Sequence, residues 1–192
     1  EIFATATCYS RNLGNEPANH VTPTYLAKAA DEIARAGKLK LTVYERADCQ
    51  KMGMGAYLGV AQGSQEPPKF IHLAYAPKGR VRKKIAVVGK GITFDSGGLD
   101  LKTADGMLRM KDDMSGAAAV LAIMRSLPAL GLPIEVHGII AATENMPSGT
   151  AQRPGDIVSA MNGTTIEIGN TDAEGRLTLA DALAYAVKVV KP

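Results

Sequence analysis

The feature that most constrains the fold is an apolar, β-branched run at residues 84–88, followed at once by a glycine-rich segment at residues 89–98. Such a run is typical of a buried strand, and we expect a loop after it. Residues 114–127 predict a helix rich in small residues, and Gly116 would let it pack closely on a sheet. Residues 134–142 are again nearly all apolar, which predicts the next strand.

The flanking segments continue this alternation of helix and strand. Thr22 and Pro23 open a predicted helix that Gly37 closes, with strands expected at 39–44 and 70–75. Asn162-Gly163 predicts a hairpin between residues 157–161 and 164–168. We expect Pro128 and Gly131-Leu132-Pro133 to end the helix predicted for residues 114–127.

The last predicted helix covers residues 177–190, and its apolar spacing defines a buried side made of Leu179, Leu183, Ala186, Val187 and Val190. Together these elements indicate a three-layer α/β/α domain with a mixed, mostly parallel sheet covered on both faces. In such folds ligands collect at the carboxyl ends of strands.

Composition narrows the class of protein. The chain has 192 residues, 46% hydrophobic and 21% charged, which is typical of one soluble globular domain. A net charge of +3 is too small to imply nucleic acid, and the basic run at 80–84 is interpreted as a solvated turn. The two cysteines form no metal-binding or disulfide pattern and suit a cytoplasmic protein, and no apolar run reaches membrane-spanning length.

Charged residues gather in two segments that follow predicted strands. The first places Lys90 and Asp95 among glycines, but it lacks the glycine and the serine or threonine that a Walker phosphate loop needs. The second holds Asp172 and Glu174, which point to the same side if the segment is extended. Two carboxylates so close favour a bound divalent cation, although an acidic turn before a helix is the simpler alternative.

Other polar residues are less telling by themselves. Asp113 opens the small-residue helix, where a carboxylate is often only a cap. His72 and His137 fall within predicted strands, outside any metal-binding pattern, and are expected to be hydrogen-bonded residues of the core or surface. Asp100 and Asp105 are interpreted as loop residues.

Several motifs, taken together and in order, resemble the leucine aminopeptidases of the cytosol aminopeptidase family. Residues 170–177 (NTDAEGRL) resemble its signature octapeptide. Residues 88–98, 110–119 and 144–149 resemble further family motifs, as do residues 11–19. The resemblance covers essentially the whole chain.

The resemblance implies a two-metal peptidase site. The implied metal ligands are five side chains, of which Asp95 and Glu174 would bridge both ions: Lys90, Asp95, Asp113, Asp172 and Glu174. Lys90 and Asp113 would complete the tighter site, and Asp172 the more exchangeable one. Mostly oxygen ligands suit zinc or manganese, and also magnesium or cobalt.

The remaining roles also come from the resemblance. Lys102 and Arg176 match the two catalytic basic residues, with Arg176 holding a bicarbonate as general base. Met110 and Asn170 match the substrate pocket, consistent with removal of an N-terminal leucine from peptides. The family assembles as hexamers, so we expect a homo-oligomer.

The resemblance also sets the expected extent of the domain. We expect residues 1–192 to form an incomplete catalytic domain, truncated at its C-terminal end, without the family's N-terminal domain. The first residue is not Met, which agrees with a piece of a longer protein. A catalytically silent fragment and a family member with a DNA-binding regulatory role are the alternative functions.

Overall fold

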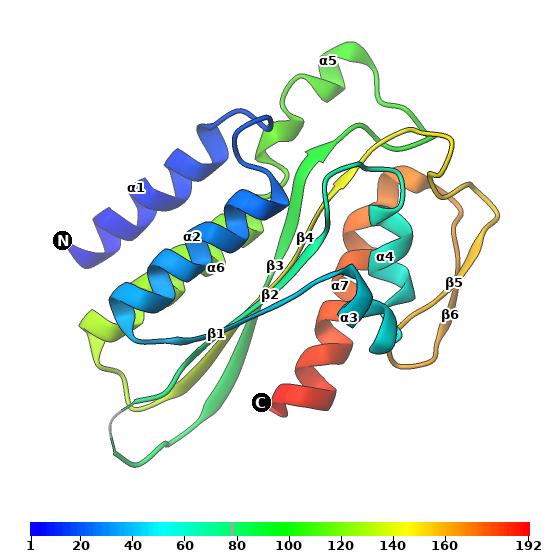
Figure 1. Ribbon diagram of the computed structural model, residues 1–192. Coiled ribbons are helices and arrows are strands. Elements are labelled where there is room, and N and C mark those ends of the chain that lie inside the picture. The colour runs from blue at the N-terminus through cyan, green and yellow to red at the C-terminus, as the bar shows by residue number, and fades with distance from the viewer. Residues whose placement is uncertain (78) are drawn as a thin grey trace.

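The computed structural model describes residues 1–77 and 79–192, and its centre is a mixed β-sheet (Figure 1). In this part of the chain the main sheet has four strands in the order β1-β2-β4-β3. β3 pairs with β4 in parallel, whereas the β1–β2 and β2–β4 pairings are antiparallel. The strands are β1 Lys40–Tyr44, β2 Lys69–Tyr75, β3 Lys84–Asp95 and β4 Glu135–Asn145.

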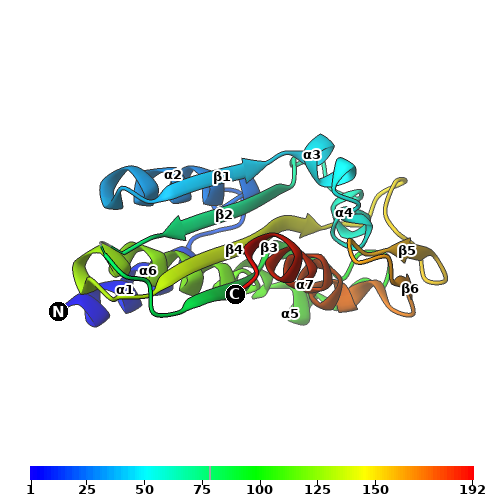
Figure 2. The ribbon, with the colours of Figure 1, turned by 90° about the horizontal axis from the view of Figure 1, so that it is seen from below.

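Helices cover both faces of this sheet, which confirms the expected three-layer α/β/α class. Helices α1, α2 and α6 lie on one side, and α3, α4 and α7 on the other (Figure 1). Figure 2 shows the succession of strands from β1 to β3 between these layers. The mixed sheet is confirmed too, with a larger antiparallel share than expected. The helices are α1 Ile2–Asn15, α2 Pro23–Gly37, α3 Arg46–Lys51, α4 Gly55–Ala61, α5 Ala104–Met107, α6 Ser115–Leu130 and α7 Glu174–Tyr185.

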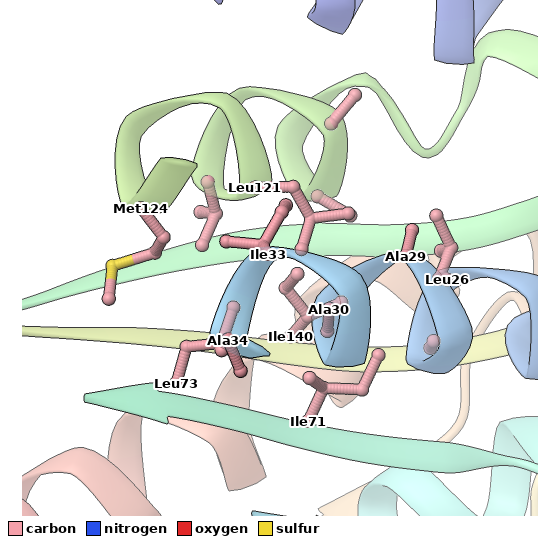
Figure 3. Close-up of a cluster of buried hydrophobic side chains, with 14 of the residues drawn as sticks. Leu26, Ala29, Ala30, Ile33, Ala34, Ile71, Leu73, Leu121, Met124 and Ile140 are labelled. Atoms are coloured by element: carbon pink, nitrogen blue, oxygen red, sulfur yellow. The ribbon is translucent and has the colours of Figure 1, made fainter. Parts of the chain in front are cut away.

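The main hydrophobic core lies between the sheet and the helices α2 and α6 (Figure 3). α2 begins where the Thr22 hydroxyl accepts a hydrogen bond from the Tyr25 N–H at 3.2 Å, with Pro23 in the first turn, as predicted. Its apolar stripe is buried against strand side chains such as Ile71 and Ile140. This packing fixes the position of the sheet, whose strand β3 carries Lys90 and Asp95.

β3 is longer than predicted, because it runs through the glycine-rich segment to Asp95 instead of ending at residue 88. The expected loop after residue 88 is therefore wrong. A Cβ on Gly89 would lie 2.4 Å from the Gly116 carbonyl oxygen, so only glycine permits α6 to approach β3 so closely. The predicted close packing through Gly116 is confirmed.

Two helix predictions are corrected in detail. Pro128 lies inside α6 and does not end it, whereas the predicted stop at Gly131 is confirmed, since Gly131 caps the helix in the left-handed region (φ 60°). The last helix begins at Glu174 and continues after Tyr185 as a π-helical turn, η3 Ala186–Val190. Leu183 and Val187 are exposed rather than buried, because the face toward the sheet carries Ala182 and Tyr185. Ala186 and Val190 are buried as predicted.

The small hairpin is present as predicted, with β5 Ile157–Ser159 paired to β6 Thr165–Glu167. Asp181 of α7 anchors it. This fully buried carboxylate accepts hydrogen bonds from the Met161 N–H at 2.7 Å and the Tyr57 N–H of α4 at 2.8 Å. One side chain thus joins the hairpin, α4 and α7.

The two strand histidines form a hydrogen-bonded chain under α7. His72 Nε2 lies 2.8 Å from His137 Nδ1, and His72 Nδ1 lies 2.9 Å from the Tyr185 hydroxyl. His137 Nε2 lies 2.7 Å from Glu135 Oε1. Burial, and then the neighbouring His137 and Lys40, lower the pKa of His72 to about 4. The expectation that these histidines are hydrogen-bonded is confirmed.

Across the described residues, no helix combines the length and the apolar character needed to cross a membrane.

Candidate metal centre

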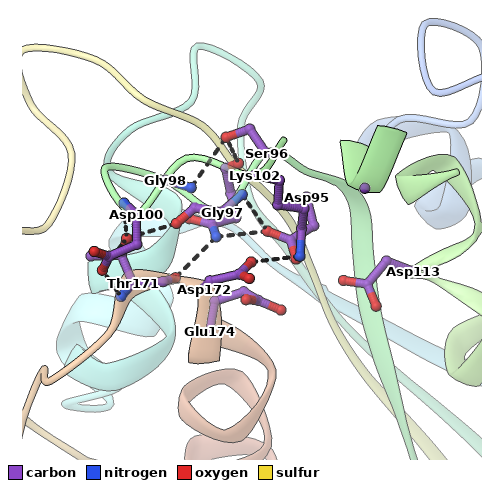
Figure 4. Close-up of polar contacts among 12 residues, drawn as sticks. Asp95, Ser96, Gly97, Gly98, Asp100, Lys102, Asp113, Thr171, Asp172 and Glu174 are labelled. Carbon is purple, nitrogen blue, oxygen red and sulfur yellow. Dashed lines mark hydrogen bonds and ion pairs between the residues drawn. The ribbon is translucent and has the colours of Figure 1, made fainter. Parts of the chain in front are cut away.

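Charged side chains from four separate segments meet beside the carboxyl ends of β3 and β4 (Figure 4). Because β3 and β4 are parallel neighbours, both end at the same edge of the sheet. The turn that leads into α6 and the start of α7 lie against this edge. A short 3₁₀ turn, η2 Thr171–Ala173, precedes α7.

Lys90 occupies the first of two cationic positions. Its Nζ lies 2.8 Å from Asp113 Oδ2 and 2.6 Å from Glu174 Oε1. Gly175 makes room for this side chain, since a Cβ there would lie 2.8 Å from Lys90 Cε. The predicted ligands Lys90, Asp113 and Glu174 are therefore in contact.

Lys102 occupies the second cationic position. Its Nζ lies 3.1 Å from Asp95 Oδ2 and 2.6 Å from Asp172 Oδ1. Lys102 follows a turn after β3, where its N–H donates to the Ser96 carbonyl at 2.9 Å. The structure thus brings Lys102 to the predicted ligands Asp95 and Asp172.

The acidic groups of the centre suit a divalent cation. Oxygen atoms of Asp95, Asp172 and Glu174 lie within 4.8 Å of one another. Glu174 is almost fully buried, and its Oε2 accepts no hydrogen bond from any described residue. Leaving a buried carboxylate oxygen without a donor is costly, and a metal ion would satisfy it. Four carboxylates also outnumber the two ammonium groups, so the residues fit such an ion.

The titration of the centre reflects burial and ion pairing. Burial raises the pKa of Asp113 to about 6, although hydrogen bonding to Lys90 opposes the rise. Burial also raises the pKa of Glu174. Burial lowers the pKa of both lysines, but their hydrogen bonds to carboxylates outweigh it, so the pKa values of Lys90 and Lys102 are raised.

The other predicted site residues lie at the margin of this cluster. Arg176 is exposed in the first turn of α7, two residues after Glu174. Met110 is half-buried at the start of a 3₁₀ turn, η1 Met110–Asp112. Asn170 is exposed and accepts a hydrogen bond from the Asp172 N–H at 2.7 Å, so it caps η2.

Three supporting residues received no role from the sequence. The Asn145 amide, at the end of β4, donates to Asp95 Oδ1 at 2.8 Å and to the Thr171 carbonyl at 3.1 Å. Thr171 is fully buried and hydrogen-bonded to Asp100. Both Asn145 and Thr171 lie in motifs that carry the family resemblance, which was the available signal. Asp100 was interpreted only as a loop residue.

Fold and site together define an α/β domain with a carboxylate-rich centre suited to divalent cations at the carboxyl ends of its strands. Residues 8–192 match the catalytic domain of the cytosol aminopeptidase family, and the chain belongs to this family. The resemblance inferred from the motifs is confirmed.

Curated relatives agree with this assignment. A probable cytosol aminopeptidase of Gloeobacter violaceus is 58% identical over 98% of this chain and 38% of its own length. One of Thermosynechococcus vestitus is 61% identical over 94% of this chain and 36% of its own length. One of Persephonella marina is 55% identical over 97% of this chain and 37% of its own length. The chain therefore spans well under half the length of these relatives.

Proposed function

We propose that this chain contributes the metal centre of an aminopeptidase that removes the N-terminal residue, preferably leucine, from peptides. The observation that carries the proposal is the convergence of Asp95, Asp172 and Glu174, with the buried Glu174 Oε2 lacking a donor among the described residues. The names of the relatives support the same activity.

Five side chains would hold two divalent ions: Lys90, Asp95, Asp113, Asp172 and Glu174. The preference for oxygen ligands favours zinc or manganese, with magnesium and cobalt as further candidates. When bound, such ions would lower the pKa of a shared water and polarise the scissile carbonyl. Lys90 would bind only as a neutral amine, so its ammonium must lose the proton that Asp113 and Glu174 now stabilise.

Lys102 and Arg176 would act on the substrate directly. The Lys102 ammonium lies between Asp95 and Asp172, where it could donate a hydrogen bond to the oxyanion that develops from the scissile carbonyl. An arginine guanidinium offers only hydrogen-bond donors, so Arg176 cannot be the base itself. Its exposed guanidinium would instead hold a bicarbonate that accepts the proton.

The substrate would lie beside the exposed edge of the centre. Met110 would contact the first side chain of the peptide, and Asn170 would line the same pocket while capping the turn that carries Asp172. We further propose that the protein works in the cytoplasm as a homo-oligomer, a hexamer by family resemblance. The expected extension of the catalytic domain beyond this chain stays a prediction.

Hydrolysis of a leucyl anilide with added Zn²⁺ or Mn²⁺ tests the proposal. The assay compares this chain with a full-length relative, such as that of Gloeobacter violaceus. Activity in the relative alone would mean that a genuine centre needs the remainder of its enzyme. Absence of metal-dependent hydrolysis in both would reject the proposal.

Replacement of Lys102 tests its role in whichever protein is active. Lys102→Ala should retain metal binding and lose about 100- to 1,000-fold in kcat, the effect typical of losing one oxyanion donor. Lys83→Ala, at an exposed lysine outside the centre, is the control. Full activity of the Lys102 variant would contradict the assignment.

A further inference from the structure

Asp100 is distinguished from its neighbours by a reciprocal contact with Thr171, although the two residues lie far apart in the chain. Asp100 Oδ2 accepts a hydrogen bond from the Thr171 N–H at 2.6 Å. In return, the Thr171 hydroxyl oxygen accepts one from the Asp100 N–H at 2.8 Å. Each residue thus satisfies the backbone of the other, which fixes the two segments in one relative position.

Thr171 extends this contact into the metal centre. Its hydroxyl donates to the Gly97 carbonyl at 2.6 Å, and its carbonyl accepts from the Asn145 amide. The same amide donates to Asp95 Oδ1, to which the Gly97 N–H also donates at 2.9 Å. We name Asp100, Asn145 and Thr171 the clasp, of which Figure 4 labels Asp100 and Thr171.

The clasp joins the two segments that supply the charged groups. Residues 96–102 lead to Lys102, and residues 170–174 carry Asp172 and Glu174. A Cβ on Gly98 would lie 2.9 Å from Asn145 Oδ1 and 3.0 Å from Thr171 Oγ1, so the segments are packed without spare room. Thr171 and Asn145 are buried, whereas Asp100 lies at the exposed edge.

We propose that Asp100 is a positioning residue that holds the Lys102 segment and the Asp172 segment together and thereby sets the affinity of the centre for divalent cations. The inference rests on the proposed function for its metal. Asp100 lies outside the group of converging carboxylates formed by Asp95, Asp172 and Glu174, and its Oδ2 accepts from the Thr171 N–H. Groups that only orient metal ligands typically contribute about 10- to 100-fold in affinity.

The chain offers a matched control for charge. Asp105, in the neighbouring α5, is also exposed and also near Lys102 in the sequence, so Asp100→Ala and Asp105→Ala each remove one negative charge. Only Asp100→Ala also removes the carboxylate oxygen that accepts the hydrogen bond from the Thr171 N–H. Asp100→Asn tests rescue, because its amide oxygen can still accept from the Thr171 N–H. Thr171→Val, compared with Thr143→Val at another buried threonine, probes the clasp from its other side.

Mn²⁺ titration calorimetry and hydrogen exchange of the metal-free chain provide the two measurements. We expect Asp100→Ala to weaken Mn²⁺ binding about 10- to 100-fold, with Asp105→Ala near the wild type and Asp100→Asn largely restored. Exchange should accelerate in both segments, 96–102 and 170–174, in Asp100→Ala and Thr171→Val but not in their controls.

The outcomes separate this inference from the proposed function. Equal Mn²⁺ affinity in Asp100→Ala and the wild type would overturn the positioning role, as would equal losses in Asp100→Ala and Asp105→Ala. If the wild type binds no Mn²⁺, the proposed metal centre fails, and with it the effect on affinity. The exchange data would then test the clasp alone: acceleration in both segments supports it, and acceleration confined to one segment overturns it.

Discussion

Glu174 binds Lys90 through one carboxylate oxygen, at 2.6 Å, while its other oxygen is buried and accepts no hydrogen bond from any part of the chain that the structure describes. The contact with Lys90 stabilises the folded protein. The burial of the second oxygen destabilises it, because this oxygen loses its hydrogen bonds to water without gaining a donor. Glu174 is therefore suited to binding a cation more than to stabilising the metal-free fold.

Glu174→Gln should separate these two effects. Metal affinity should fall by more than about 100-fold, beyond the loss typical of groups that only support a ligand. The free energy of unfolding of the metal-free chain should fall by no more than about 1 kcal/mol, the net contribution of one hydrogen bond. Lys90 keeps Asp113 as a partner, and burial already disfavours the charged form of Glu174. Calorimetry and urea unfolding measure the two quantities. Glu167→Gln, at an exposed glutamate, is the control, and unchanged affinity in Glu174→Gln would refute its role as a ligand.

Gly175→Ala should disturb the centre without unfolding the protein. The added methyl group would lie 2.9 Å from Lys90 Nζ and would push this flexible side chain from its carboxylates. Alanine also favours the helix by up to about 1 kcal/mol, which offsets part of the crowding. We expect near-normal thermal stability with weaker Mn²⁺ binding. Gly149→Ala, where the methyl group meets nothing within 4 Å, should change neither.

The histidine chain makes stability depend on pH. The pKa of His72 is lowered to about 4, so between pH 6.5 and about 4 the unfolded chain binds a proton that the folded chain does not. The contribution of His72 to the free energy of unfolding therefore falls as the pH falls through this window, by up to about 1.4 kcal/mol per pH unit. The raised pKa of Asp113 contributes with the opposite sign below about pH 6, so the His72 effect is measured as a difference between variants.

Urea unfolding between pH 4 and pH 7 checks this dependence. His72→Gln should lose less stability than the wild type as the pH falls from 6.5 to about 4, because it lacks the titrating imidazole. His20→Gln, at an exposed histidine paired with Glu16, is the comparison. Identical slopes in His72→Gln and the wild type would show that another group is responsible.

Asp181→Asn should destabilise the protein by about 1–3 kcal/mol, the cost of leaving a buried donor unsatisfied. The asparagine oxygen can accept from Tyr57 or Met161, but its amide group then faces the other N–H. Asp31→Asn, which breaks only the exposed pair with Arg35, should cost no more than about 1 kcal/mol. Equal small losses in both variants would mean that the anchor at Asp181 contributes little.

The sequence predicted the three-layer arrangement of helices and sheet better than it predicted where individual helices and strands begin and end. Periodicity located the helix that became α2 and the strands that became β1, β2 and β4, because these segments bury one continuous apolar face. The last part of β3 was missed because glycines usually mark loops, and the packing of Gly89 against Gly116 is a tertiary property. Helices α1, α3 and α4 were not predicted either, and α1 depends on its contact with α6.

The sequence identified the residues of the candidate site more readily than the contacts between them. Lys90, Asp95, Asp172 and Glu174 stood out through their motifs, and the structure places them together. Asp100 and Asp105 looked equivalent in the sequence, since nothing local distinguishes two acidic residues in one loop. Only the fold brings Thr171 to Asp100 and separates their roles.

The wide spacing of the charged residues has a consequence for how the protein folds. Lys90 and Glu174 are separated by β4, α6 and the hairpin, so their contact closes a very long loop of chain. Long-range contacts of this kind form late, after the entropy of loop closure has been overcome. Partly folded chains should therefore have little affinity for metal, and the rate at which refolding protein acquires Mn²⁺ affinity should report the last step of assembly.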